Sequence, residues 1–205
     1  MKPALQDLLR RVYSGAILVI WIILPYALLQ HVAVREIWWI EPTWFDRWVG
    51  IHFHSIWLYI SFYLLLGLTG LLVERRVYLK YLYAVGWTAM AAHMIFLMLP
   101  NGLSREAIET QGAPAIYQWL VALDQPRNAF PSLHVALSVV AGLAVQSSQR
   151  FSVAIKLVAW LWVLGIIWST IALGQHVIYD AISGTLIAVG VWWAVGRYAT
   201  SIKGG

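Results

Sequence analysis

Six long apolar stretches alternate with short polar segments along the 205-residue chain. A transmembrane helix needs roughly 20 mostly apolar residues, and the fourth stretch is short unless Ala129 and Phe130 are added to it. The stretches run near Val12–Leu29, Ile51–Val73, Val77–Leu99, Pro131–Val145, Val153–Ala172 and His176–Val195. This pattern predicts an all-α polytopic membrane protein, a bundle of six transmembrane helices that forms one integral-membrane domain over residues 1–205.

The composition supports the same class. Hydrophobic residues make up 61% of the chain and charged residues 11%, whereas a soluble domain carries about 25% charged residues. The chain has 13 Trp, 10 Tyr and no Cys. These values exclude an ordinary soluble enzyme, a disordered chain, a disulfide scaffold and any chemistry that uses a cysteine thiolate.

The distribution of Lys and Arg predicts the orientation, because cytoplasmic segments of membrane proteins are enriched in these residues. With the N-terminus inside, the outer segments hold four: Arg35, Arg47, Arg105 and Arg127. The inner segments hold ten: Lys2, Arg10, Arg11, Arg75, Arg76, Lys80, Arg150, Lys156, Arg197 and Lys203. We therefore expect both termini to be cytoplasmic, in a plasma (inner) membrane. The first stretch lacks a small-residue cleavage pattern, so we expect a retained signal anchor.

Two longer segments fall on the outer side. The first, His31 to Gly50, mixes four Trp with charged residues, which predicts a short helix at the level of the lipid headgroups. The alternative is an aromatic belt without chemistry. The second, Pro100 to Phe130, is the most polar part of the chain. Water-exposed chemistry is therefore expected on this side.

Asp180 is the acidic residue that lies well inside an expected span, where a charge is costly and indicates function. It follows His176 by four residues, so the two side chains share one helix face. The carboxylate can accept a hydrogen bond from one imidazole nitrogen and leave the other with a lone pair for attack or binding. The alternative is a structural pair that satisfies only itself.

His134 stands at the start of another span, directly after Pro131-Ser132-Leu133. Such a helix start presents free backbone N–H groups and the positive end of the helix dipole, so it can bind an anion. His134 could protonate a leaving oxygen there, or it could be an interfacial His bonded to a loop carbonyl. Together with Arg105 and Arg127, these groups can bind and transfer a phosphoryl group. The chain contains no HExxH, no GxSxG and no acidic dyad, which excludes the usual sites for proteolysis.

These residues resemble motifs of the type 2 phosphatidic acid phosphatase superfamily. Pro131-Ser132-Leu133-His134 is similar to its second motif, Pro-Ser-Gly-His. Ser169-Thr170, five residues, His176, three residues and Asp180 keep the spacing of its third motif, in which Arg stands where this chain has Thr170. The first motif is degenerate over Leu99–Arg105, with Met98 in place of Lys and Glu106 in place of Pro. The segment NAFPSLHVA looks most like the branch that contains inositol phosphorylceramide synthases.

The resemblance implies a phosphohistidine mechanism with His176 as nucleophile, Asp180 as its orienting carboxylate and His134 as general acid. It implies that Ser132, the Leu133 amide and Ser169 hold phosphoryl oxygens and that Arg105 is the remaining cation of the first motif. The phosphate site then lacks two cations. Arg127, four residues before Pro131, is our own candidate to replace them.

The expected function is therefore cleavage of a lipid phosphate ester on the outer face, with water or an alcohol as acceptor. The expected partners are a lipid phosphate and the bilayer, without nucleic acid, metal or cofactor. Two alternatives stay open: a non-enzymatic scaffold or transporter, and a cytochrome whose haem is held by histidines on different spans, such as His93, His134 and His176. Glycines within the spans, namely Gly67, Gly70, Gly142, Gly184 and Gly190, are expected to allow close helix contact.

Overall fold

The computed structural model describes residues 3–105, 108 and 112–201, and helices dominate this part of the chain. Five of its helices are long and apolar enough to cross a membrane: α1 (Pro3–His31), α3 (Ile56–Leu72), α4 (Arg75–Met98), α7 (Val153–Ala172) and α8 (Ile178–Ser201). The predictions of an all-helical fold and of an integral membrane protein are thus confirmed. The fourth stretch forms α6 (Leu133–Ser147), which has 15 residues and falls below that length.

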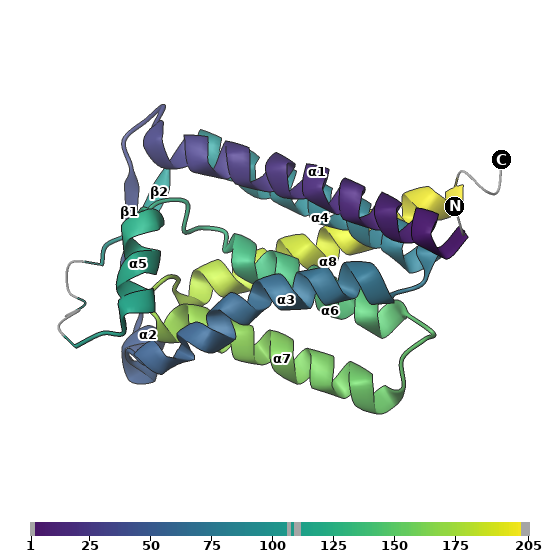
Figure 1. Ribbon diagram of the computed structural model, residues 1–205. Helices are drawn as coiled ribbons and strands as arrows, with labels where there is room; N and C mark the ends of the chain where they lie inside the picture. Colours follow the sequence, from purple (N-terminus) through teal and green to yellow (C-terminus); the bar gives the residue numbers. More distant parts are fainter. Residues whose placement is uncertain (1–2, 106–107, 109–111, 202–205) are drawn as a thin grey trace.

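α6 occupies the centre of the bundle and packs against α3, α4, α7 and α8 (Figure 1). Its side chains are small and almost all buried, from Leu133 to Val145. A helix of this length extends about 22 Å, less than the roughly 30 Å of a bilayer core. Because protein surrounds α6, the polar backbone at its ends is shielded from lipid, and a short helix is tolerated.

Close packing around α6 depends on particular glycines. A Cβ at Gly184 of α8 would lie 2.5 Å from the carbonyl oxygen of Ser132, and a Cβ at Gly142 would lie 3.2 Å from side-chain atoms of α7. The predicted role in close helix contact is confirmed at these two positions. It is wrong at Gly67 and Gly190, where a Cβ would meet nothing within 4 Å.

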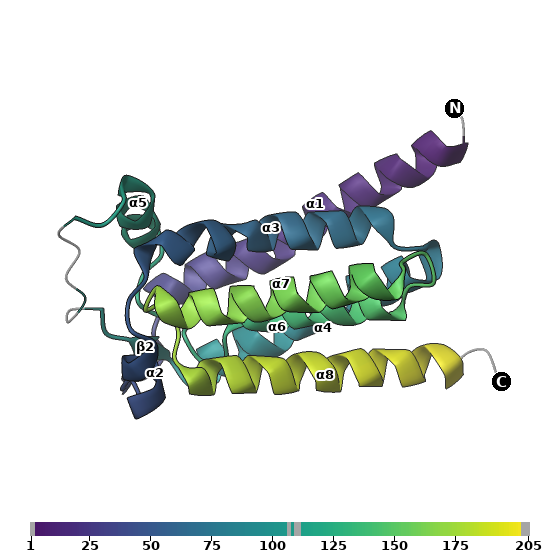
Figure 2. The same cartoon turned by 90° about the horizontal axis from the view of Figure 1, so that it is seen from below.

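α1 lies at the edge of the bundle, mainly against α4, and its N-terminal half diverges from the other helices (Figure 2). Arg11 ties it to the bundle although most of its apolar side chains are exposed. The Arg11 guanidinium donates at 2.9 Å to the carbonyl of Gly70 and at 2.9 Å to that of Val73, at the end of α3. A cation there also interacts favourably with the negative end of the α3 dipole.

The two long connecting segments lie at the end of the bundle opposite both termini (Figure 1). They form β1 (Trp38–Ile40), α2 (Trp44–Val49), the 3-10 helix η1 (Phe53–Ser55), β2 (Asn101–Leu103) and α5 (Ala115–Leu123). β1 and β2 pair in parallel, with Trp38 opposite Asn101. This pairing joins the two outer segments, and hydrophobic periodicity alone gave no sign of it.

α2 is a short helix within the first outer segment, where one was expected. It begins at a capping box: the Thr43 side chain accepts from the backbone of Asp46, and the Asp46 carboxylate accepts from the backbone N–H of Thr43. It ends at Gly50, whose φ of 70° favours glycine. Trp44 and Trp48 are each 75% exposed.

Candidate active site

The turn between α7 and α8 places His176. Gly174 adopts a φ of +64°, which favours glycine, and the carbonyl of Thr170 accepts from the N–H groups of Gln175 and His176 at 3.0 and 3.1 Å. The buried Tyr117 hydroxyl of α5 donates to the Leu173 carbonyl at 3.1 Å, and burial raises the pKa of Tyr117. These contacts account for the fixed spacing between Ser169-Thr170 and His176.

One ring nitrogen of His176, Nδ1, faces two hydrogen-bond acceptors. Nδ1 lies 3.0 Å from the carbonyl oxygen of Ala129 and 3.4 Å from Oδ2 of Asp180. A carbonyl and an ionised carboxylate both accept hydrogen bonds and donate none. Nδ1 must therefore carry the proton, and in the neutral ring Nε2 has the lone pair. The arrangement provides a nucleophile or a ligand.

Asp180 is fully buried. Its Oδ2 accepts from the N–H of Val177 at 3.0 Å, and its backbone carbonyl accepts from the N–H of Ser132 at 3.0 Å. Among the residues that the structure describes, Oδ1 has no hydrogen-bond partner. A buried carboxylate with one unsatisfied oxygen is costly, and it stabilises positive charge that develops on the adjacent imidazole.

His134 lies beside this pair, with its ring centroid 6.2 Å from that of His176. Side chains of α3 hold it: its Nδ1 is 3.3 Å from the Tyr59 hydroxyl, and its ring lies 4.8 Å from the Phe62 ring. The two imidazoles are therefore neighbours, as a nucleophile and a proton donor that act on one phosphoryl group must be.

The Ala129 carbonyl is held in place by Asn101, which is 1% exposed. The Asn101 side chain accepts from the Phe130 N–H at 2.7 Å and donates to the Phe130 carbonyl at 2.7 Å. Its backbone carbonyl accepts from the N–H of Asn128, a residue with a φ of 59°. β2 thus fixes the segment whose carbonyl fixes His176.

The expected phosphate-binding groups of the helix ends have defined partners. Ser132 is fully buried, and its hydroxyl oxygen accepts from the Val135 N–H at 3.3 Å as the N-cap of α6. Leu133 follows as the first residue of that helix. The Ser169 hydroxyl donates to the Ile166 carbonyl at 2.7 Å, so its proton is used within α7 and its lone pairs remain.

Arg105 joins the second outer segment to the turn before His176. Its guanidinium donates to the Asp124 carbonyl at 2.7 Å and to Oε1 of Gln175 at 2.6 Å, and it pairs with the Asp124 carboxylate at 3.5 Å. Asp124 also accepts from the side chains of Tyr26 and Gln30 of α1. Arg105 therefore contacts Gln175, the residue before His176, while its charge is paired with Asp124.

Arg127 belongs to the same side of the network. Its guanidinium donates to the Gln30 carbonyl at 3.0 Å, and its backbone bridges to Gly102. The structure thus gives Arg127 a partner at the end of α1. Glu106 of the degenerate first motif lies outside the described residues.

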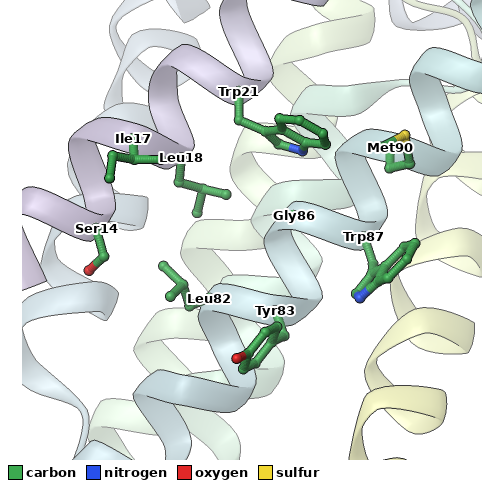
Figure 3. A pocket seen from close by; sticks show the side chains of 9 residues that line it. All are labelled: Ser14, Ile17, Leu18, Trp21, Leu82, Tyr83, Gly86, Trp87 and Met90. Carbon is green, nitrogen blue, oxygen red and sulfur yellow. The ribbon is translucent and has the colours of Figure 1, made fainter.

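Two cavities are relevant. The larger, about 350 Å³, lies between α1 and α4 (Figure 3) and contains no His, Lys, Arg, Asp or Glu. The second, about 270 Å³, lies over His176 and is lined by residues of both outer segments and of the α7–α8 turn. Phosphoryl chemistry requires charged or nucleophilic groups, so the second cavity is the candidate site. His134 is not among its lining residues.

Several contacts of the site could not be found from sequence spacing. Three groups come from positions far in the chain from the histidine that they help to position. They are the Ala129 carbonyl, the Asn101 side chain that bonds to Phe130, and the Tyr59 hydroxyl. The carboxylate of Asp46 in α2 accepts from the N–H of Ile178 at 2.8 Å, which caps the start of α8. Asp46 gave a local signal, the capping box, but no sign of its partner.

Comparison with known proteins supports the resemblance seen in the motifs. Residues 102–202, just under half of the chain, match the family model described as PAP2 superfamily. This segment includes His134, His176 and Asp180, and the match supports the type 2 phosphatidic acid phosphatase superfamily and a phosphatase-type function on lipid phosphates in general. No curated protein and no solved structure matches the chain.

Proposed function

We propose that this membrane protein cleaves a lipid phosphate ester through a phosphohistidine intermediate on His176. The observation that supports this most directly is that Nδ1 of His176 faces two hydrogen-bond acceptors. The Ala129 carbonyl oxygen lies 3.0 Å from it and Oδ2 of Asp180 lies 3.4 Å from it. These acceptors fix the tautomer in which Nε2 is nucleophilic. The second imidazole, His134, supplies the proton donor that the leaving group needs.

In the first step the Nε2 lone pair attacks phosphorus, a P–N bond forms, and the ester P–O bond breaks. His134 gives its proton to the departing alkoxide oxygen, which leaves as an alcohol. The imidazole of His176 becomes positively charged, and the Asp180 carboxylate stabilises that charge at 3.4 Å. The Ala129 carbonyl keeps the ring oriented throughout.

In the second step an acceptor attacks the phosphohistidine, and His134 takes the acceptor's proton while the P–N bond breaks. Water as acceptor yields inorganic phosphate, and a second alcohol yields a phosphodiester or a new phosphate ester. The segment NAFPSLHVA resembles the branch that contains inositol phosphorylceramide synthases. This resemblance supports transfer to an alcohol. The chemistry of the first step is the same in both cases.

We infer that α6 is the sixth crossing, with both termini in the cytoplasm and the site at the outer face. Both termini lie at one end of the bundle and the site segments at the other (Figures 1 and 2), as an even number of crossings requires. The surplus of Lys and Arg lies toward the termini. The exposure of Trp44 and Trp48 supports a position of α2 at the headgroup level of the outer leaflet, because Trp is enriched at membrane interfaces.

The test compares purified wild type with His176→Ala on a panel of lipid phosphates, with and without an alcohol such as inositol. Phosphate release without alcohol that is lost in His176→Ala supports a phosphatase. A phosphate ester of the added alcohol, formed only when that alcohol is present, supports a transferase. Equal activity of the two proteins would refute the assignment and favour the scaffold alternative.

A further inference from the structure

The cavity over His176 brings a cationic side chain to the site. Arg47 of α2 lines this cavity together with His176, and so do Asp46 and Ser104. Arg47 is exposed. Among the described residues that line the cavity, it is the only Lys or Arg. The sequence placed Arg47 in the first outer segment, away from every recognised motif.

We propose that Arg47 binds the phosphoryl group of the substrate above His176. This inference rests on the proposed function and names a residue that completes its phosphate site. A phosphoryl group in this cavity carries negative charge, and a guanidinium recognises it with paired N–H donors at fixed spacing. Among the described residues, the structure records one hydrogen bond from the Arg47 guanidinium, to the Pro42 carbonyl at 2.5 Å. An arginine has five N–H donors.

The other two outer arginines are directed elsewhere. Arg105 donates to Asp124 and Gln175, and Arg127 donates to the carbonyl of Gln30. Neither lines the cavity over His176. The cation that faces the nucleophile's cavity therefore comes from α2.

The position of Arg47 is fixed through its neighbour Asp46. One carboxylate oxygen of Asp46 accepts from the Ile178 N–H at 2.8 Å, and the other accepts from the Thr43 N–H and hydroxyl at 2.7 Å each. α2 is thus bound to the first residue of the helix that follows His176. Asp46 adds negative charge to the lining, so a bound anion requires the opposing charge of Arg47.

The experiment measures kcat and KM for wild type, Arg47→Ala, Arg47→Lys and Arg35→Ala, the last a matched control on an exposed arginine of the same segment. Each protein is given a lipid phosphate in detergent micelles and the water-soluble ester p-nitrophenyl phosphate. We expect Arg47→Ala to lower kcat/KM about 10- to 100-fold on both substrates, mainly through KM. Arg47→Lys should recover part of the loss, and Arg35→Ala should match wild type.

A binding measurement separates this inference from the proposed function. Calorimetry with inorganic phosphate should show binding to wild type and Arg35→Ala and a loss of at least about tenfold in affinity for Arg47→Ala. If wild type hydrolyses neither ester but shows this binding difference, the proposed function fails and the role of Arg47 stands. Unchanged kinetics and phosphate binding in Arg47→Ala would overturn the inference. So would a loss confined to the lipid substrate, which would indicate that Arg47 contacts the membrane surface.

Discussion

Replacement of Asp180 by Asn tests how His176 is activated. Asn has the same shape as Asp, and its amide oxygen can still accept from the Val177 N–H, which lies 3.0 Å from Oδ2 of Asp180. The change therefore removes the negative charge with little effect on packing. The Ala129 carbonyl remains 3.0 Å from Nδ1 of His176 and continues to hold the reactive tautomer.

The magnitude follows from the distance between the charges. A unit charge pair at the 3.4 Å separation of Nδ1 and Oδ2 interacts by about 5 kcal/mol at an effective dielectric constant of about 20. The charge on an imidazolium is shared between two nitrogens, so about 2–3 kcal/mol is assigned to Nδ1. Loss of that stabilisation corresponds to a decrease in kcat of about 30- to 150-fold.

The assay is single-turnover hydrolysis of a lipid phosphate by wild type, Asp180→Asn and His176→Ala. Asp180→Asn should keep measurable activity, whereas His176→Ala should be inactive. A decrease of less than about fivefold would show that the Asp180 charge plays no part in the chemistry. A decrease of more than about 10⁴-fold would show that Asp180 sets the tautomer, as in a Ser-His-Asp triad, and that the Ala129 carbonyl does not.

Three further predictions concern the fold. Gly184→Ala should inactivate the enzyme by displacing the Ser132 carbonyl, which its Cβ would approach to 2.5 Å, while Gly190→Ala should be neutral in the same assay. Arg11→Ala should lower the free energy of unfolding in detergent by about 2–3 kcal/mol, because the guanidinium bonds to the end of α3 are lost. Burial alone would raise the pKa of the Glu74 carboxyl, but hydrogen bonds from Ser148 and Gln149, in the segment between α6 and α7, hold that pKa below its ordinary 4.5. This stabilisation is complete above pH 4.5 and is lost as the pH falls through the lowered pKa. Acidification should therefore lower the melting temperature of wild type more than that of Glu74→Gln.

The long elements were predictable because hydrophobic runs report burial in lipid or protein directly. α7 has the same limits, Val153–Ala172, as the fifth apolar stretch. α1 begins at Pro3, well before the first apolar stretch at Val12. The charged residues Asp7, Arg10 and Arg11 of its first turns keep the hydrophobic pattern from extending to Pro3. Backbone hydrogen bonds do not depend on side-chain polarity, so the helix continues through them.

The chemistry of the site was partly predictable. The four-residue spacing of His176 and Asp180 led us to expect two side chains on one helix face, and the structure has them 3.4 Å apart. The helix face was wrong: α8 begins at Ile178, so the turn between α7 and α8 positions His176. The parallel pairing of β1 with β2 and the contact between Asp46 and Ile178 join distant segments. Contacts of this kind depend on the assembled fold, and no local pattern of residue types encodes them.

The most direct test of the account is detection of the phosphohistidine itself. Wild type mixed with a lipid phosphate is quenched at short times under alkaline conditions, which preserve phosphohistidine, and is digested and mapped by mass spectrometry. The account predicts one phosphoryl adduct on the peptide that contains His176, with none in His176→Ala and a longer-lived adduct in His134→Ala, which lacks the base for the second step. Turnover by wild type with no adduct at any time, or an adduct on another residue, would contradict it.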